Sequence, residues 1–230
     1  MAPDVSALQL VLSGDPALFA IVRLSLLVSL SAVIGAAVIG LPLGAVIALM
    51  RFPGRQLAVV ILNALMGLPP VVVGLLVYLA LSRSGPLGSW GILFTPQAMI
   101  IAQTILIAPI IAALTRQTIE DLWVEYRDEL AAMDVGAAGR VATLLWDARF
   151  SLVTALLAGF GRAAAEVGAV IIVGGNIDGF TRMMTTAIAL ETSKGDLPLA
   201  LGLGLVLIAI VVTVNAAAWG VRRVGERIAG

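Results

Sequence analysis

The sequence contains no cysteine and no histidine. Disulfides, thiolate or imidazole metal ligands, cysteine nucleophiles and every histidine-dependent catalytic dyad or triad are therefore excluded. The only lysine, Lys194, lies between Ser193 and Gly195. Because a P-loop requires Gly-Lys followed by Ser or Thr, this chain does not bind ATP through such a loop. We expect no catalytic residue and no metal site.

Charge is also scarce. Charged residues make up 12% of the chain, against about a quarter in soluble domains. Fourteen basic residues balance fourteen acidic ones and are thinly spread, so no basic patch for nucleic acid is expected. Hydrophobic residues reach 60%, and the mean hydropathy is +1.09. Most of the surface is therefore expected to face membrane lipid.

Long apolar runs dominate what is present. A membrane-spanning helix needs about 20 mainly apolar residues. Four uncharged stretches exceed that length: 24–50, 56–82, 84–115 and 197–221. The segment 83–90, which contains Gly85, Pro86 and Gly88, is predicted to be a tight exposed turn between the second and third of them. A fifth, from Phe150 to about Val173, is interrupted by Arg162 and Glu166, whose i, i+4 spacing puts them on one helix face. The prediction is an all-α polytopic bundle of about five spanning helices, with residues 1–230 as one transmembrane domain.

Glycine and proline mark special points in the first two predicted spans. Gly40 and Gly44 have the spacing of small residues that allows close contact between helices. Pro69 and Pro70 remove two backbone donors, so the helix predicted there must bend.

The basic residues predict the orientation, because Lys and Arg are retained on the cytoplasmic side of short loops. Five spans put the two termini on opposite faces. With the N-terminus outside and the C-terminus inside, the outer connections carry three basic residues, Arg83, Arg182 and Lys194. The inner connections then carry nine: Arg51, Arg55, Arg116, Arg127, Arg140, Arg149, Arg222, Arg223 and Arg227.

The most polar segment, 117–149, is predicted to be a cytoplasmic connection. Its run 128–135 favours a short helix, for which Gly136 would supply the C-cap. A rigid helix that projects from a membrane bundle suits the transmission of force from a soluble partner. A solvated connecting loop is the alternative.

Two groups of residues carry a family resemblance. Leu130-Ala131-Ala132, followed after three residues by Gly136, resembles the EAA-type loop of ABC importer permeases, with Glu129 beside the position of the family's glutamate. The downstream sequence is similar to the tungstate branch of that family. It comprises LLWDARF (144–150), AGFGR (158–162), AEVGAV (165–170), VGGNI (173–177) and TRMMTTAIALETSKGD (181–196).

The resemblance implies a type I importer permease in the cytoplasmic (inner) membrane that passes tungstate, or a related oxyanion such as molybdate or sulfate. It also implies a homodimer, a pair of ATPase subunits that bind ATP and Mg, and an external substrate-binding protein. The permease itself would not be an enzyme. Coupling to the ATPase is expected in residues 128–139, at Glu129, Leu130, Ala131, Ala132, Gly136 and Gly139.

The external connection, 174–196, is the second candidate region. The resemblance implies that 183–190 re-enters the bundle as a short gate helix. The residues expected at the pathway or gate are Arg162, Glu166, Asn176, Arg182, Thr185 and Thr186. Arg162 and Glu166 form either a structural ion pair or part of the pathway.

The same residues allow two other functions. In a stand-alone secondary transporter or channel, Arg162 and Glu166 would relay ions or protons, but the chain lacks the inverted repeats common in such proteins. In an intramembrane enzyme, Glu166 would be the acid or base, but no His, Cys or cluster of metal ligands accompanies it.

Overall fold

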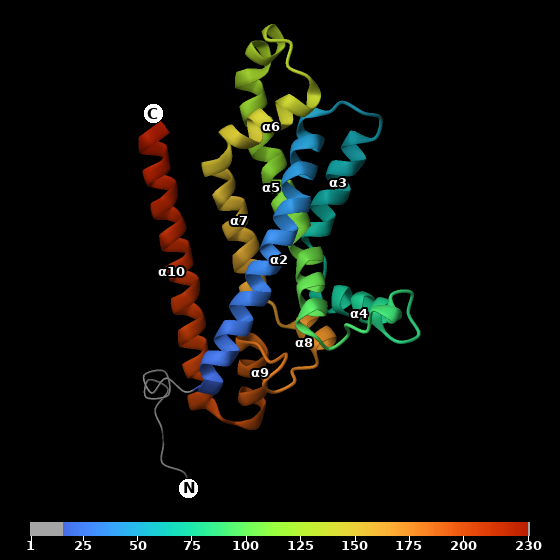
Figure 1. Ribbon diagram of the computed structural model, residues 1–230, viewed down its shortest axis with the longest axis vertical. Coiled ribbons are helices and arrows are strands. Elements are labelled where there is room, and N and C mark those ends of the chain that lie inside the picture. Colours follow the sequence, from blue (N-terminus) through green and yellow to red (C-terminus); the bar gives the residue numbers. More distant parts are fainter. Residues whose placement is uncertain (1–15, 230) are drawn as a thin grey trace. The chain divides into compact units, whose positions relative to one another are not determined.

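The computed structural model describes residues 16–229, and every regular element in that range is helical (Figure 1). The elements are α2 (Pro16–Leu49), α3 (Arg55–Met66), α4 (Pro70–Leu81), the 3-10 turn η1 (Gly88–Trp90), α5 (Pro96–Ala132), α6 (Ala137–Asp147), α7 (Arg149–Ala164), α8 (Gly168–Gly174), α9 (Met184–Lys194) and α10 (Leu197–Ala229). The all-α prediction is confirmed. The predicted external location of the N-terminus concerns residues that lie outside this range.

Three of these helices, α2, α5 and α10, are long and apolar enough to cross a membrane. The described chain has up to five spans by length and composition if the pairs α3–α4 and α6–α7 each count as one. The bundle is therefore polytopic, as predicted, although several boundaries differ from the predicted ones.

The predicted span 56–82 is broken into α3 and α4. Gly67 ends α3, and Pro69, with the extended backbone angles φ −65° and ψ 122°, is the N-cap of α4. Pro70 then occupies the first turn, where the lack of an N–H costs nothing. The two prolines thus end one helix and begin another, which is a stronger effect than the bend expected from sequence.

Two further predicted helices are shorter than expected. The predicted turn at 83–90 is confirmed, but turns continue to residue 95, so α5 begins only at Pro96. The positive φ angles of Gly91 (63°) and Phe94 (62°) are incompatible with a helix there. The predicted span 150–173 is interrupted between α7 and α8, which places Glu166 in the break. Hydropathy alone does not detect these interruptions.

Contacts divide the described chain into two compact units. Unit 1 comprises 16–32, 69–103 and 161–215; unit 2 comprises 33–68, 104–160 and 216–229.

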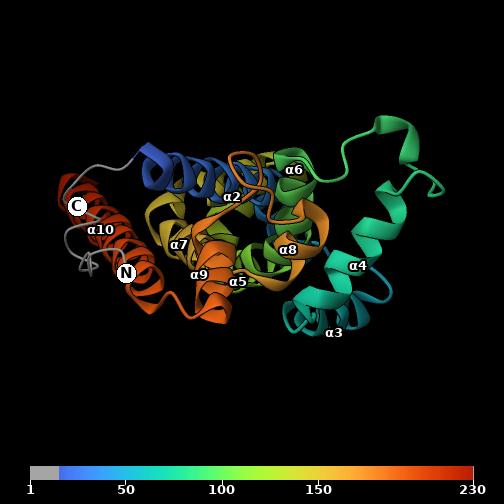
Figure 2. The same ribbon diagram turned by 90° about the horizontal axis from the view of Figure 1, so that it is seen from below.

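In unit 1, α4 packs against α8 (Figure 2). The close approach requires Gly74, because a Cβ there would lie 2.8 Å from Ala169 Cα. The amide of Phe94 donates to the carbonyl of Val173 at 2.9 Å, which ties the segment before α5 to α8. A second cluster, around buried Met184, joins α9 to α10 and to the start of α2.

In unit 2, the second half of α2 packs closely on α5. A Cβ on Gly40 would lie 2.9 Å from Ala108 O, and one on Gly44 would lie 2.8 Å from Thr115 Cβ. The predicted role of these glycines in close helix contact is confirmed. The C-terminal part of α5 continues to Ala132, so much of the predicted cytoplasmic connection is an extension of this helix.

Candidate functional site

The end of α5 is shaped by a left-handed turn. Asp134 has φ 50°, the amide of Val135 donates to Leu130 O at 3.2 Å, and the amide of Asp134 donates to Ala131 O at 3.1 Å. This pair of hydrogen bonds is a Schellman cap. The predicted C-cap, Gly136, instead has φ −67° and ψ 166° and is the N-cap of α6. Asp134 takes the left-handed position expected for the glycine.

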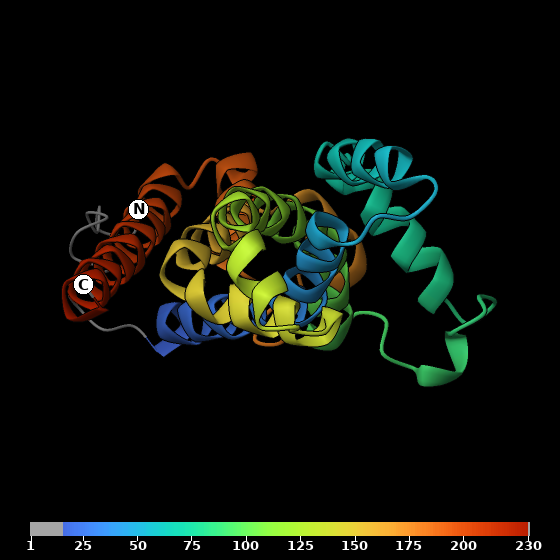
Figure 3. The same ribbon diagram turned by 90° about the horizontal axis from the view of Figure 1, so that it is seen from above.

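Helix α6 lies beside the C-terminal part of α5 and meets α7 at a bend of 77° (Figures 1 and 3). Its buried face, with Leu144 at 1% exposure, joins a core to which α2, α5 and α7 also contribute. Arg140 reinforces this contact: its Nε donates to Val135 O at 2.7 Å, and its guanidinium lies 5.7 Å from the Trp123 ring. Because the helix is packed on three others, it is held rigidly.

The opposite face of this region is exposed. We call it the α5–α6 surface, and its exposed residues include Glu129, Ala131, Ala132, Met133, Gly136, Gly139 and Trp146. Met133 is 64% exposed and Trp146 is 71% exposed. Arg149 holds Trp146 in place, with its guanidinium 4.9 Å from the ring and its Nη1 donating to Trp146 O at 2.7 Å.

Five of the six predicted coupling residues lie on the α5–α6 surface. The sixth, Leu130, is 2% exposed and packs in the core beneath α6. Its side chain supports the surface and does not reach a partner. Met133 and Trp146 are not among the coupling residues predicted from the sequence. Large apolar residues in a segment predicted to be cytoplasmic are the signal that would have found them.

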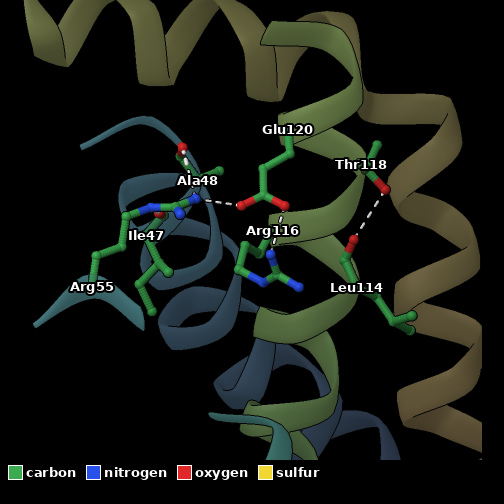
Figure 4. Close-up of polar contacts among 7 residues, drawn as sticks. All are labelled: Ile47, Ala48, Arg55, Leu114, Arg116, Thr118 and Glu120. Carbon is green, nitrogen blue, oxygen red and sulfur yellow. Dashed lines mark hydrogen bonds and ion pairs between the residues drawn. The ribbon is translucent and has the colours of Figure 1, made fainter. Parts of the chain in front are cut away.

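A second cluster in unit 2, also not selected from sequence, joins α2, α3 and α5 (Figure 4). Arg55 Nε donates to Ile47 O at 2.9 Å, and so satisfies one of the free carbonyls at the end of α2. Glu120 accepts from Arg55 and also from Arg116 Nη1, the latter at 2.5 Å. The Arg55–Glu120 pair is partly exposed, so we expect it to contribute about 1 kcal/mol.

Glu166 is one of the residues predicted at the pathway or gate. Its side chain is 2% exposed, and its Oε2 lies 2.6 Å from Arg162 Nη1. Its Oε1 accepts the amide of Ala169, at the start of α8, at 2.9 Å. Its backbone carbonyl accepts the hydroxyl of Thr185 at 2.8 Å. One residue thereby joins the end of α7, the start of α8 and α9.

The turn after α8 has the unusual backbone angles expected for this sequence, with φ 73° at Gly175 and 51° at Asn176. The hydroxyl of Thr181 stabilises it by donating to Gly174 O at 2.6 Å and accepting the amide of Ile177 at 2.9 Å. Thr181 is fully buried. The segment is therefore a tightly bonded turn.

The threonine hydroxyls expected at the gate already donate within the chain. Thr185 donates to the carbonyl of Glu166, and Thr186 donates to Met183 O at 3.1 Å. Asn176 Nδ2 donates to Thr186 O at 3.5 Å. Each hydroxyl has one hydrogen to donate, so neither is available to an anion in this conformation. A helix is present at 184–194, where a short one was predicted.

Among residues 16–229, no group of three or more acidic side chains could hold a metal ion. This part of the chain contains two candidate features. One is the rigidly packed, exposed surface at one end of α5, and the other is the junction of helices that hydrogen bonds and an ion pair hold around Glu166.

Comparison with known proteins decides the family. No family model matches the chain. It is 42% identical, over 86% of its length and 88% of the relative's, to a probable anion ABC transporter permease protein of Haloferax volcanii. It is 39% identical to the tungstate uptake system permease protein TupB of Peptoclostridium acidaminophilum, over 94% of this chain and 95% of the relative. The chain belongs to the ABC transporter permease family.

A further relative, the TupB permease of Campylobacter jejuni, is 38% identical over 64% of this chain and 61% of its own length. An ABC transporter permease is a transport subunit, and the ATPase is a separate chain. The predictions of a multi-pass membrane protein, of a permease and of the tungstate and oxyanion branch are thereby confirmed. The roles of individual residues, the second permease copy and the orientation of the termini stay predictions.

Proposed function

We propose that this permease, as a homodimer, imports tungstate or a related tetrahedral oxyanion across the cytoplasmic membrane. Its relatives support this substrate class, because two are named as tungstate permeases and one as an anion permease. ATP and Mg would be bound by a separate pair of ATPase subunits, and an external binding protein would deliver the anion. The N-terminus would lie outside and the C-terminus inside.

The observation that carries the coupling mechanism is the α5–α6 surface. It exposes Met133 and Trp146 on a helix pair that is packed rigidly against α2 and α7. Buried aromatic anchors dominate the energy of typical protein interfaces. A rigid helix with such an anchor would convert movement of the ATPase into a rigid-body movement of the spanning helices. We therefore assign this surface as the docking site of the ATPase.

Arg162 and Glu166 are assigned a structural role within this mechanism. Both carboxylate oxygens of Glu166 have partners inside the chain, at 2.6 and 2.9 Å. A relay residue must exchange its partners for a substrate ion or a proton. Both oxygens of this carboxylate already have partners within the chain. The geometry favours the structural ion pair over the ion relay of a secondary transporter.

Association with the ATPase tests the docking site. The permease is co-expressed with its ATPase subunit, and the complex is purified. We expect Trp146→Ala to weaken co-purification at least about tenfold, since a truncated anchor typically costs 2 kcal/mol or more. Trp90→Ala is the matched control, because Trp90 is also exposed, at 58%, but lies in η1. Equal co-purification of the two variants would refute the assignment.

Point substitutions are preferable to a deletion of residues 128–139. Such a deletion would remove Leu130 from the core, so a failure to bind could simply reflect misfolding.

Uptake into proteoliposomes tests the substrate class. The vesicles contain the permease and ATPase, with binding protein on the side of uptake. We expect ATP-dependent uptake of labelled tungstate and competition by unlabelled molybdate. Uptake of tungstate without ATP would contradict the ATP-driven mechanism, and uptake of only a non-oxyanion would contradict the substrate class.

A further inference from the structure

A pocket in unit 1 brings two arginines together. It has a volume of about 480 Å³ and lies between the first turns of α2 and the turn that precedes α9. Arg23 lines it from α2, and Arg182 lines it from the turn. Apolar side chains, among them Phe19 and Phe180, form other parts of its wall. Only Arg182 was selected from sequence.

Arg182 is well placed to bind an anion. Its side chain is 20% exposed, and its Nη1 lies 3.0 Å from Asp178 Oδ1. Its Nε is buried and has no hydrogen-bond partner among the residues that the structure describes. A guanidinium has five N–H donors, so the bond to Asp178 leaves most of them available. Because Asp178 is itself 78% exposed, its hold on Arg182 is weakened by water.

Arg23 adds a second positive charge. Within residues 16–229 it has no ion pair, and its side chain is exposed. Among residues 16–229, Asp178 is the only acidic residue that lines the pocket. The two arginines and one aspartate of this described wall carry a net charge of +1 in a partly apolar recess, where an anion is attracted more strongly than in bulk water.

Hydrogen bonds hold the two arginine-bearing segments together. The amide of Met184 donates to Ser25 Oγ at 2.8 Å. Met184 follows Arg182 by two residues, and Ser25 follows Arg23 by two residues. Ser25 is 4% exposed, and its hydroxyl donates to Ile21 O at 2.8 Å. The turn is held as well, because the amide of Arg182 donates to Ile177 O at 3.0 Å. The separation of the arginines is therefore set before any ligand arrives.

We propose that this pocket binds a tetrahedral oxyanion between Arg23 and Arg182. The planar guanidinium fork matches the oxygens of such ions. Asp178 competes with the anion for Arg182 and is displaced when it binds. The same chemistry fits a free oxyanion and the phosphate of an anionic lipid, so the test has an arm for each. That the free anion is the transported one rests on the proposed function.

Equilibrium dialysis of radiolabelled tungstate against the full-length permease, in nanodiscs of phosphatidylcholine alone, tests the site. Neither the ATPase nor the binding protein is present, so failure here does not affect the test of ATPase docking. We expect Arg23→Gln and Arg182→Gln each to raise the Kd about tenfold, as for loss of one charge-assisted hydrogen bond. Asp178→Asn should lower the Kd about two- to fivefold by removing the competitor. Arg83→Gln, at a turn outside this pocket, should leave it unchanged.

The second arm uses nanodiscs that contain phosphatidylglycerol. If lipid phosphate occupies the pocket, tungstate binding by the unmodified protein weakens in these discs. Native mass spectrometry then finds the lipid retained by that protein and lost from Arg23→Gln and Arg182→Gln. Thermal unfolding shows which variants are folded. If either arginine variant does not fold, Asp178→Asn still tests the proposal, because it keeps both arginines. Equal tungstate binding and equal lipid retention across the folded variants would overturn the proposal.

Discussion

The Arg162–Glu166 pair is either a structural ion pair, which we call the structural lock, or an ion relay. The two roles predict different effects of substitution on stability. If the pair holds α7, α8 and α9 together, removal of either partner should destabilise the protein. Replacement of both by apolar residues of similar size should largely restore it, because a buried ion pair gains little over good apolar packing. We therefore consider Glu166→Leu, Arg162→Met and the double variant.

The expected costs follow from the burial of the partner that is left behind. Breaking a buried pair costs about 3–5 kcal/mol. Glu166→Leu leaves Arg162, which is 31% exposed and still reaches water, so we expect the lower end, about 3 kcal/mol. Arg162→Met leaves a carboxylate that is 2% exposed, so we expect about 4 kcal/mol. The double variant should lose less than about 2 kcal/mol, including the bond from Ala169.

Thermal unfolding of the purified permease measures these differences. For chains of this length, 1 kcal/mol shifts the Tm by about 2–4 °C. The single variants should therefore lose roughly 6–12 °C and 8–16 °C, and the double variant clearly less than either. Additive losses in the double variant would refute the structural lock. So would an unchanged Tm in both single variants together with a loss of ATP-driven uptake, which is the result expected of a pathway residue.

Three further substitutions test the packing of the helices, each by the Tm. Gly44→Val should cost about 3 kcal/mol or more, because its side chain would meet the backbone of α5, whereas Gly204→Val has open space around it and serves as the control. Glu120→Gln should cost about 1 kcal/mol by weakening its bonds to both arginines, and Glu125→Gln, an exposed acid on the same helix, should cost less. Thr185→Val should cost about 1 kcal/mol by removing one hydrogen bond at the α7–α8 break. For the first two substitutions, an equal Tm of variant and control would contradict the contact, and for Thr185→Val an unchanged Tm would.

Apolar runs predicted the helical class and the approximate number of spans, because lipid requires long segments whose backbone bonds are satisfied internally. They did not predict every helix end. Glycine and proline predict the turn at 83–90, but left-handed residues such as Gly91 and Phe94 extend the break to residue 95. Gly136 was assigned the wrong end of a helix because Asp134 could take the same left-handed conformation.

For the candidate site, the sequence predicted which residues interact better than it predicted what each residue does. The i, i+4 spacing of Arg162 and Glu166 predicted their ion pair, which the structure contains. It could not reveal that Glu166 also binds the start of α8 and α9, because those partners are distant in sequence or depend on the helix break. Leu130 was grouped with its exposed neighbours, although packing beneath α6 buries it.

Composition and local pattern by themselves determined that this protein is a helical membrane protein without thiol, imidazole or P-loop chemistry. Those properties depend on which residues are present and on short-range periodicity. Tertiary structure decided which side chains are free to act. It exposed Trp146, bonded the hydroxyl of Thr185 to the carbonyl of Glu166, and placed Arg23 and Arg182 on the wall of one pocket. Such outcomes depend on contacts between segments far apart in sequence, which no local pattern encodes.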